Sequence, residues 1–188
     1  PFEGCYNKYL DDLEYPALYL STAPYISTDV PYGDMTVMTD AEDISYQEHW
    51  YRGSCFDNLQ TYWREFARET PLENRQYIQP GSNDTCTLAA HVKVAAGQRK
   101  KVRYLISWNV PNMYMYWADG HGWYEEDDAG NAPAWKNYYA TQWKDSTHSA
   151  QYAMKHWDRL YMQTNRFRKA LFSSTLPQAA IEAVAANL

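Results

Sequence analysis

The C-terminal part of the chain, from Ser146 onward, has apolar residues at helical spacing. The positions on this stripe are Tyr152, Ala153, His156, Trp157, Leu160, Thr164, Phe167 and Leu171. Steps of three and four residues place these side chains on one face of a helix, and Asp145, Ser146 and Thr147 are suitable N-cap residues before it. The pattern therefore predicts one long amphipathic helix that ends at the Ser173-Ser174-Thr175 break.

A second helix is predicted after this break. Pro177 stands near its first turn, where the missing N–H of proline is harmless. The apolar residues that follow at i, i+3, i+4 and i+7 are Ile181, Val184, Ala185 and Leu188. Because this stripe is unfinished at Leu188, and a helix must bury its apolar face against another element, we expect the chain to be cut just inside an α-helical domain.

The central part of the chain alternates apolar and polar residues with the period of a strand. One face of the segment from Thr85 to Val94 is largely apolar, and the alternation resumes from Val102 to Trp108 before Pro111 ends it. A glycine-containing turn at Ala95–Gln98 joins the two segments. This connection suggests that the two strands are antiparallel neighbours.

Two weaker strands are predicted at Ala17–Thr22 and Gly33–Thr39, the second with Met35 and Val37 facing inward. Together the four segments predict an antiparallel β-sandwich or a large part of one. Between them Asp57 begins a predicted helix. The apolar residues on one side of this helix are Leu59, Tyr62, Trp63 and Phe66.

The organisation predicted from these patterns is mainly β with α. Residues 1–116 form the β-sandwich portion with its inserted helix, and residues 117–145 form an aromatic and acidic loop with a linker. Residues 146–188 form a linker helix and the start of a truncated α-helical domain.

Composition excludes several classes of function. The net charge is −6 and the pI is near 5.3, whereas nucleic-acid binding needs clustered Lys and Arg. The one basic cluster, Arg99-Lys100-Lys101, fits a solvated turn between strands. No apolar run is long enough to cross a membrane. Three cysteines without a CxxC spacing predict neither a disulfide framework nor a zinc site, and no cofactor motif is present.

The candidate binding residues are aromatic. Trp117, Trp123 and Trp135 are the residues that we expect to contact substrate, because aromatic faces pack well on the C–H surfaces of sugars. The four acids from Glu125 to Asp128 fit a solvated loop better than a catalytic pair, because a general acid needs burial or a close like charge. His49 with Glu48 falls short of the three or four ligands that a metal needs, so a structural role is expected.

Three segments resemble a known family. These are the run from Arg103 to Asn112 (RYLISWNVPN), the Asn137-Tyr138-Tyr139 motif, and the run from Arg166 to Pro177 (RFRKALFSSTLP). They are similar to glycoside hydrolase family 116, the family of the non-lysosomal bile-acid β-glucosidase and its bacterial and archaeal relatives. The resemblance implies an N-terminal β-sandwich that leads through a linker and a helix into an (α/α)6 barrel, on which the sandwich packs.

The resemblance also implies retaining hydrolysis of β-glucosides. In that chemistry one carboxylate attacks the anomeric carbon and a second, about 5–5.5 Å away, protonates the leaving oxygen. In this family both carboxylates come from the barrel, beyond Leu188, and no residue here matches either motif. The resemblance therefore assigns no catalytic residue to this chain, which we expect to be inactive alone.

Two alternatives stay open at the level of sequence. The first is a free-standing carbohydrate-binding module, in which the tryptophan-rich loop would be the whole function. The second is the equivalent region of another enzyme that combines a sandwich with an (α/α)6 domain, such as a glycoside phosphorylase, because fold alone does not separate these functions.

Overall fold

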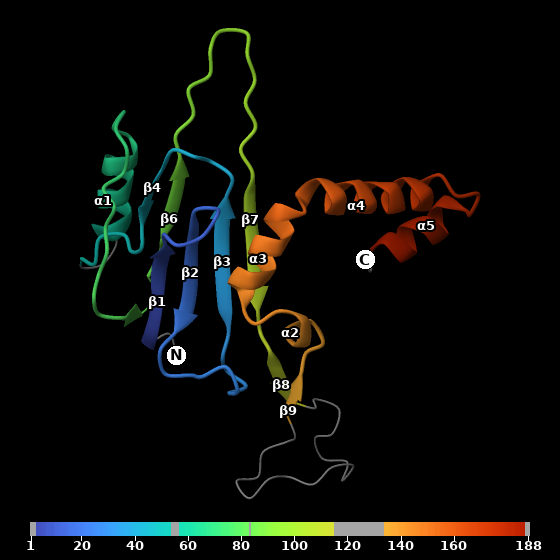
Figure 1. Cartoon of the computed structure of the whole chain (residues 1–188), viewed down its shortest axis with the longest axis horizontal. Coiled ribbons are helices and arrows are strands. Elements are labelled where there is room, and N and C mark those ends of the chain that lie inside the picture. The colour runs from blue at the N-terminus through green and yellow to red at the C-terminus, as the bar shows by residue number, and fades with distance from the viewer. Residues whose placement is uncertain (1–2, 54–56, 83, 115–133, 187–188) are drawn as a thin grey trace, which may run out of the picture. The chain divides into compact units, whose positions relative to one another are not determined.

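The computed structural model describes residues 3–53, 57–82, 84–114 and 134–186, and the chain forms two compact units, Pro1–Gln151 and Tyr152–Leu188 (Figure 1). The first unit contains β1 (Glu3–Leu10), β2 (Ala17–Thr22), β3 (Asp34–Thr39), β4 (Ile44–Gln47), α1 (Asp57–Phe66), β5 (Gly81–Ser82), β6 (Thr87–Ala90), β7 (Tyr104–Asn109), β8 (Asn112–Tyr114), β9 (Ala134–Lys136), α2 (Tyr139–Gln142) and the start of α3 (Ser146–Lys155). The second contains the end of α3, then α4 (Trp157–Phe172) and α5 (Gln178–Ala185).

The strands form antiparallel sheets, as the sequence predicts. A five-stranded sheet has the order β5-β1-β2-β3-β7, and the pairs β4-β6 and β8-β9 form two smaller sheets. The bounds predicted for β2 are confirmed, and β3 begins one residue later than predicted. The (α/α)6 barrel implied by the resemblance stays a prediction.

The inward face of β3 is the opposite of the one predicted. Met35 is 37% exposed, whereas Thr36 and Met38 are fully buried. The physical reason is a polar contact with α3, since the Thr36 hydroxyl lies 2.8 Å from the Ser146 hydroxyl and 2.9 Å from that of Thr147. A threonine with two hydroxyl partners can be buried at little cost, so the polar face of the strand is the one that becomes covered.

Hydrogen bonds continue this contact between α3 and the sheet. One Asp34 carboxylate oxygen accepts the backbone N–H of Ser146 at 2.7 Å, and the other accepts the Asn109 side-chain amide at 2.8 Å. The Ser107 and Ser149 hydroxyls lie 2.6 Å apart. The first turn of α3 is thus attached to β3 and β7 by polar groups, and the carboxylate stands where the helix N-terminus favours negative charge.

The strands predicted at Thr85–Val94 and Val102–Trp108 are not neighbours. β6 pairs with β4, and β7 pairs with β3, so this part of the prediction is wrong. β6 also ends at Ala90, because β4 offers only four residues to pair with, and Val94 beyond it is 54% exposed. Figure 1 shows the long connection between β6 and β7, which contains the predicted turn: the Gln98 N–H donates to the Ala95 carbonyl.

The two-stranded sheet β4-β6 lies against one face of the five-stranded sheet. Tyr46 of β4 stacks on Tyr9 of β1 with ring centroids 3.9 Å apart. The Tyr104 hydroxyl on β7 accepts the Ala90 N–H at 3.0 Å and donates to the Leu88 carbonyl of β6. Strand alternation and register place Tyr9 and Tyr104 on the same face, so the small sheet is attached to that face at both of its sides.

Helix α1 forms where the sequence predicts it, but none of its residues is buried. Tyr62 stacks on Trp50 with centroids 3.9 Å apart, and the Glu65 carboxylate binds Arg75 at 2.7 Å and Gln47 at 2.8 Å. Trp63 remains 63% exposed. The predicted apolar face of α1 is therefore not buried as a whole. The helix is attached to the rest of the unit by the stack of Tyr62 on Trp50 and by the polar contacts of Glu65.

The long C-terminal helix is interrupted. Its predicted cap is confirmed, because the Asp145 carboxylate accepts the His148 N–H at 2.8 Å. At His156 the backbone leaves the helical region (φ −106°), so two helices, α3 and α4, replace the single one predicted. The break before the last helix is confirmed, since α4 ends at Phe172 and α5 begins at Gln178.

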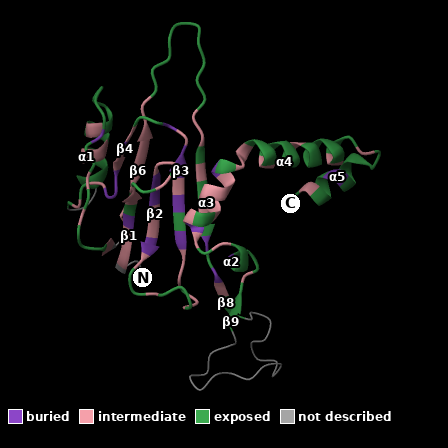
Figure 2. Cartoon of the chain, viewed as in Figure 1, coloured by how far each residue is buried: buried purple, intermediate pink, exposed green. Residues whose placement is uncertain are grey.

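Polar residues make up much of the buried interior. Figure 2 shows buried positions on β2 and β3. The buried polar residues include Thr36 and Thr39 of β3, Ser45 and Gln47 of β4, and His49, and the apolar ones include Ala17, Leu18 and Met38. Buried polar groups cost free energy unless they are hydrogen-bonded. The hydroxyls of Thr36, Thr39 and Ser45 are hydrogen-bonded, so hydrogen bonds as well as apolar packing specify this interior.

Candidate functional site

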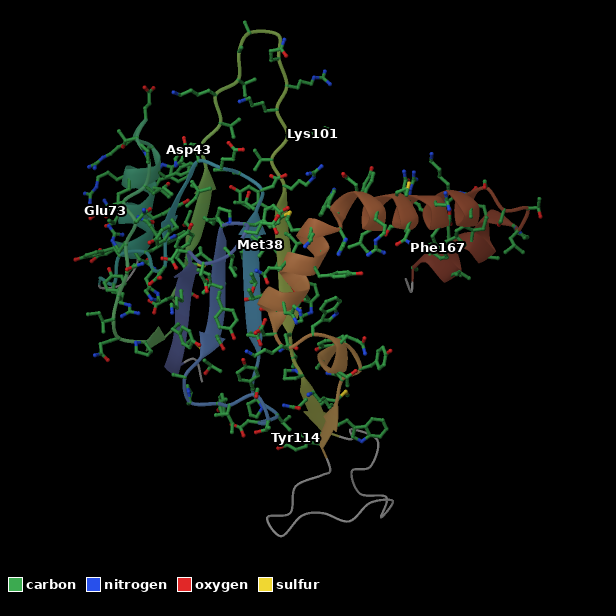
Figure 3. All side chains as sticks on the ribbon, in the orientation of Figure 1. Met38, Asp43, Glu73, Lys101, Tyr114 and Phe167 are labelled. Carbon is green, nitrogen blue, oxygen red and sulfur yellow. The ribbon has the colours of Figure 1, made fainter. Side chains whose placement is uncertain are left out.

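The predicted binding residue that the structure places is Trp135, on strand β9. Trp117 and Trp123 lie outside the described residues. β9 pairs with β8, so that Trp135 stands opposite Met113 and Ala134 opposite Tyr114. Trp135 is 55% exposed, and Tyr114 and Met113 are also exposed (Figure 3 labels Tyr114). We refer to β8 and β9 together as the aromatic hairpin.

Side-chain hydrogen bonds anchor the base of the aromatic hairpin. The Asn112 amide donates to the Ser27 carbonyl at 2.9 Å and to the Asp29 carbonyl at 3.0 Å. The Asn137 amide donates to the Val110 carbonyl at 2.7 Å, and its backbone N–H donates to the Pro111 carbonyl. Among the described strands, β8 pairs with β9 and not with the five-stranded sheet. The two asparagines instead attach the hairpin to neighbouring segments through hydrogen bonds to backbone carbonyls.

A tyrosine completes this anchor. The Tyr139 hydroxyl of α2 donates to the Val110 carbonyl at 2.5 Å and accepts the Val110 N–H at 3.0 Å. The segment quoted for the family resemblance, Asn137-Tyr138-Tyr139, therefore holds the hairpin to the end of β7, while Tyr138 itself is 79% exposed. The arrangement presents aromatic rings on a fixed base, which suits packing against sugar C–H surfaces.

A second cluster, around His49, was not predicted as a unit. His49 is 1% exposed, and its Nδ1 lies 3.4 Å from the Asp84 carboxylate, which a bidentate contact with Arg52 neutralises at 2.8 and 3.2 Å. The Arg52 guanidinium also lies 4.4 Å from the Tyr77 ring centroid. Burial lowers the pKa of His49 and the Arg52 charge lowers it further, against an opposing effect of Asp84. At neutral pH the imidazole is therefore uncharged.

The pairing of His49 with Glu48 considered from the sequence is not what the fold brings together. Adjacent residues of an extended segment point in opposite directions, and the Glu48 carboxylate instead accepts the backbone N–H of Tyr9 at 2.7 Å. The described part of the chain contains no group of three or more His, Cys, Asp or Glu residues that could hold a metal ion. Among the described residues, no helix has the length and apolar character needed to cross a membrane.

The described part of the chain is an antiparallel β domain that leads into helices and carries an exposed aromatic hairpin. Comparison with known proteins assigns this domain to a family. The family model described as beta-glucosidase 2, glycosyl-hydrolase family 116 N-term, matches residues 3–160. The chain therefore belongs to glycoside hydrolase family 116, as its N-terminal region. A comparison with the curated proteins finds no match.

Proposed function

We propose that the chain is the N-terminal, non-catalytic portion of a retaining β-glucosidase, whose catalytic carboxylates lie beyond Leu188. The observation that carries this proposal is the family match over residues 3–160, which spans the sheets and the helices up to the first turn of α4. Membership of the family points to a glycoside as substrate and to hydrolysis as the reaction. The division of labour between this region and a catalytic (α/α)6 domain is our proposal.

In this proposal the helices of the second unit pack on the catalytic domain. Several large apolar side chains of α4 and α5 are exposed (green in Figure 2), and Phe167 is 57% exposed. The others of this kind are Tyr161, Met162 and Phe172 of α4 and Val184 of α5, and Leu176 in the connection between the two helices is exposed as well. Exposed apolar side chains in such number support a docking role, because burial of each large one contributes about 1.5–3 kcal/mol.

The aromatic hairpin is proposed to form part of the rim around the substrate. Trp135 is the described residue that would contact the sugar or aglycone beyond the cleaved bond. Its exposure and its position on a hydrogen-bonded base support this role, since a fixed aromatic face binds with little loss of side-chain entropy.

The test begins with the gene beyond the codon for Leu188. We expect an open frame that encodes a catalytic domain, and we expect its full product to hydrolyse an aryl β-glucoside while the present chain alone does not. Turnover by the present chain alone would contradict the proposal. A stop codon directly after Leu188 would also contradict it and would favour a small sugar-binding protein.

The rim role is tested in the full product by Trp135→Ala, with Trp63→Ala on α1 as a matched control of similar exposure. We expect Trp135→Ala to raise KM about tenfold with little change in kcat, because a contact made equally in the ground and transition states affects binding alone. Equal KM values in the two variants would refute the rim role and leave the division of labour standing.

A further inference from the structure

A groove of about 410 Å³ follows the free edge of strand β1. β5 pairs only with the start of β1, at Glu3 and Cys5, so the rest of that edge has no neighbouring strand in the described part of the chain. The aromatic residues that line the groove are Tyr6, Tyr9 and Tyr77. Its volume falls within the range of small-molecule sites, roughly 300–1,000 Å³.

A buried carboxylate faces this groove. Glu48 is 6% exposed and lines the groove together with the buried Asn7, whose amide fixes the Glu48 backbone by donating to its carbonyl at 2.8 Å. The Oε1 atom of Glu48 accepts the Tyr9 N–H at 2.7 Å. Its other oxygen makes no hydrogen bond, and the carboxylate has no ion-pair partner, among the described residues. This second oxygen is accessible to solvent, so a donor that enters the groove can bond to it in place of water.

Aromatic and amide groups surround this carboxylate. Tyr9 stacks on Tyr46 with an interplanar angle of 9°, and the Gln76 amide donates to the Tyr46 hydroxyl at 3.0 Å. Burial raises the pKa of Tyr9, so its phenol stays protonated and can donate to a ligand in the groove. Asp11 and Lys8 lie at the same groove and add exposed polar groups.

These features select among possible ligands. An added peptide strand would need the backbone N–H groups of the β1 edge, but Glu48 already occupies that of Tyr9. A neutral sugar fits better, because its hydroxyls can donate to the free Glu48 oxygen while its C–H face packs on tyrosine. The geometry points to a carbohydrate-binding site in this groove, which takes one neutral hexose unit of a glycoside or glycan through Glu48, Gln76 and the tyrosines.

This site goes beyond the proposed rim, since it uses β1, Glu48 and the segment 76–80 and no residue of the aromatic hairpin. Its ligand would be a sugar bound without chemical change. A shallow groove with one strong acceptor gives weak affinity, with Kd on the order of 1 mM.

The test is a saturation-transfer NMR titration of the full chain with methyl β-glucoside. We compare Glu48→Gln, Gln76→Ala, the exposed control Gln98→Ala, and Trp135→Ala in the rim. The amide introduced by Glu48→Gln can still accept the Tyr9 N–H, so the fold is expected to persist, and urea unfolding checks this. We expect Glu48→Gln to weaken binding about tenfold, as when a charge-assisted hydrogen bond becomes neutral, and Gln76→Ala to weaken it severalfold.

Binding to Gln98→Ala and Trp135→Ala should equal that of the wild type. Absence of saturable binding to the wild type, or equal binding to Glu48→Gln and wild type, would overturn the inference. Loss of binding in Trp135→Ala alone would also overturn it, but would support the rim proposed above. The failure of the groove and the failure of the rim are therefore distinguishable.

Discussion

Replacement of Asp34 by asparagine tests the polar contact that joins the sheet to α3. Asp34 is 5% exposed, and each of its two carboxylate oxygens accepts a hydrogen bond, one from the Ser146 N–H and one from the Asn109 amide. Asparagine has the same shape but only one oxygen. In Asp34→Asn one of the two buried donors must therefore face an NH₂ group.

The expected loss follows from the bond that disappears. A hydrogen bond to a charged group contributes about 1.5–3 kcal/mol net, and a buried donor left unpaired costs about 1–3 kcal/mol. The two figures are alternative estimates of the same lost hydrogen bond, so they are not added. We therefore expect Asp34→Asn to lower the free energy of unfolding by about 2–3 kcal/mol. For a chain of this length the melting temperature should fall by roughly 4–12 °C.

The assay is urea unfolding followed by tryptophan fluorescence, with Asp12→Asn as the control at an exposed aspartate. The m value should stay constant, since the surface exposed on unfolding is unchanged. The double variant Asp34→Asn with Asn109→Asp exchanges the two groups, so the amide at position 34 can accept from Ser146 and donate to the new carboxylate. We expect it to recover at least half of the loss.

A change below about 0.5 kcal/mol in Asp34→Asn would show that the carboxylate does not hold α3 to the sheet. Absence of any recovery in the double variant would show that the pattern of donors and acceptors between positions 34 and 109 does not determine the loss. Either result would contradict the prediction that the paired donors and acceptors of Asp34 and Asn109 hold α3 to the sheet.

Three further predictions follow from other sites. Burial lowers the pKa of His49, so near a pH of about 6.5 the unfolded chain binds more protons than the folded chain, and the free energy of unfolding should fall as the pH drops below that value. Equal slopes of unfolding free energy against pH in the wild type and in His49→Gln would contradict this. Burial raises the pKa of the Cys86 thiol to about 11, so its alkylation at neutral pH should be about a hundredfold slower than for an exposed thiol, as mass spectrometry of modified peptides would show. Gly97 has φ +73° with open space around it, so Gly97→Ala should cost about 1 kcal/mol of unfolding free energy through backbone strain alone; an unchanged urea midpoint would be the contrary result.

Local structure was largely predictable from the sequence. The strand at Ala17–Thr22, the helix from Asp57, the turn before Gln98 and the helix break before Gln178 all appear in the structure. Each depends on residues within a few positions of one another, through side-chain period, capping groups or a glycine at a positive φ. The family resemblance, which also rests on short runs of residues, is confirmed by the match over residues 3–160.

The candidate sites were predictable only in part. Trp135 was chosen from its residue type, and its contact with a sugar stays a prediction, while the structure shows that its side chain is exposed. The groove beside β1 was not visible, because it joins Tyr9, Glu48 and Gln76, which no short motif connects. Such a site exists only after β1 and the segment that contains Gln76 have been placed side by side.

By itself the sequence determined the strand at Ala17–Thr22, the helix from Asp57, the helix break before Gln178, the antiparallel β character of the domain and the family to which it belongs. Tertiary structure decided which face of each strand is buried and which strands are neighbours. Alternation with a period of two marks two faces but does not say which partner each face meets. Thr36 looks like a surface residue in its segment, yet it is buried because Ser146, 110 positions away, supplies a hydroxyl for it. A contact between residues so distant in sequence leaves no local signal, so only the folded chain reveals it.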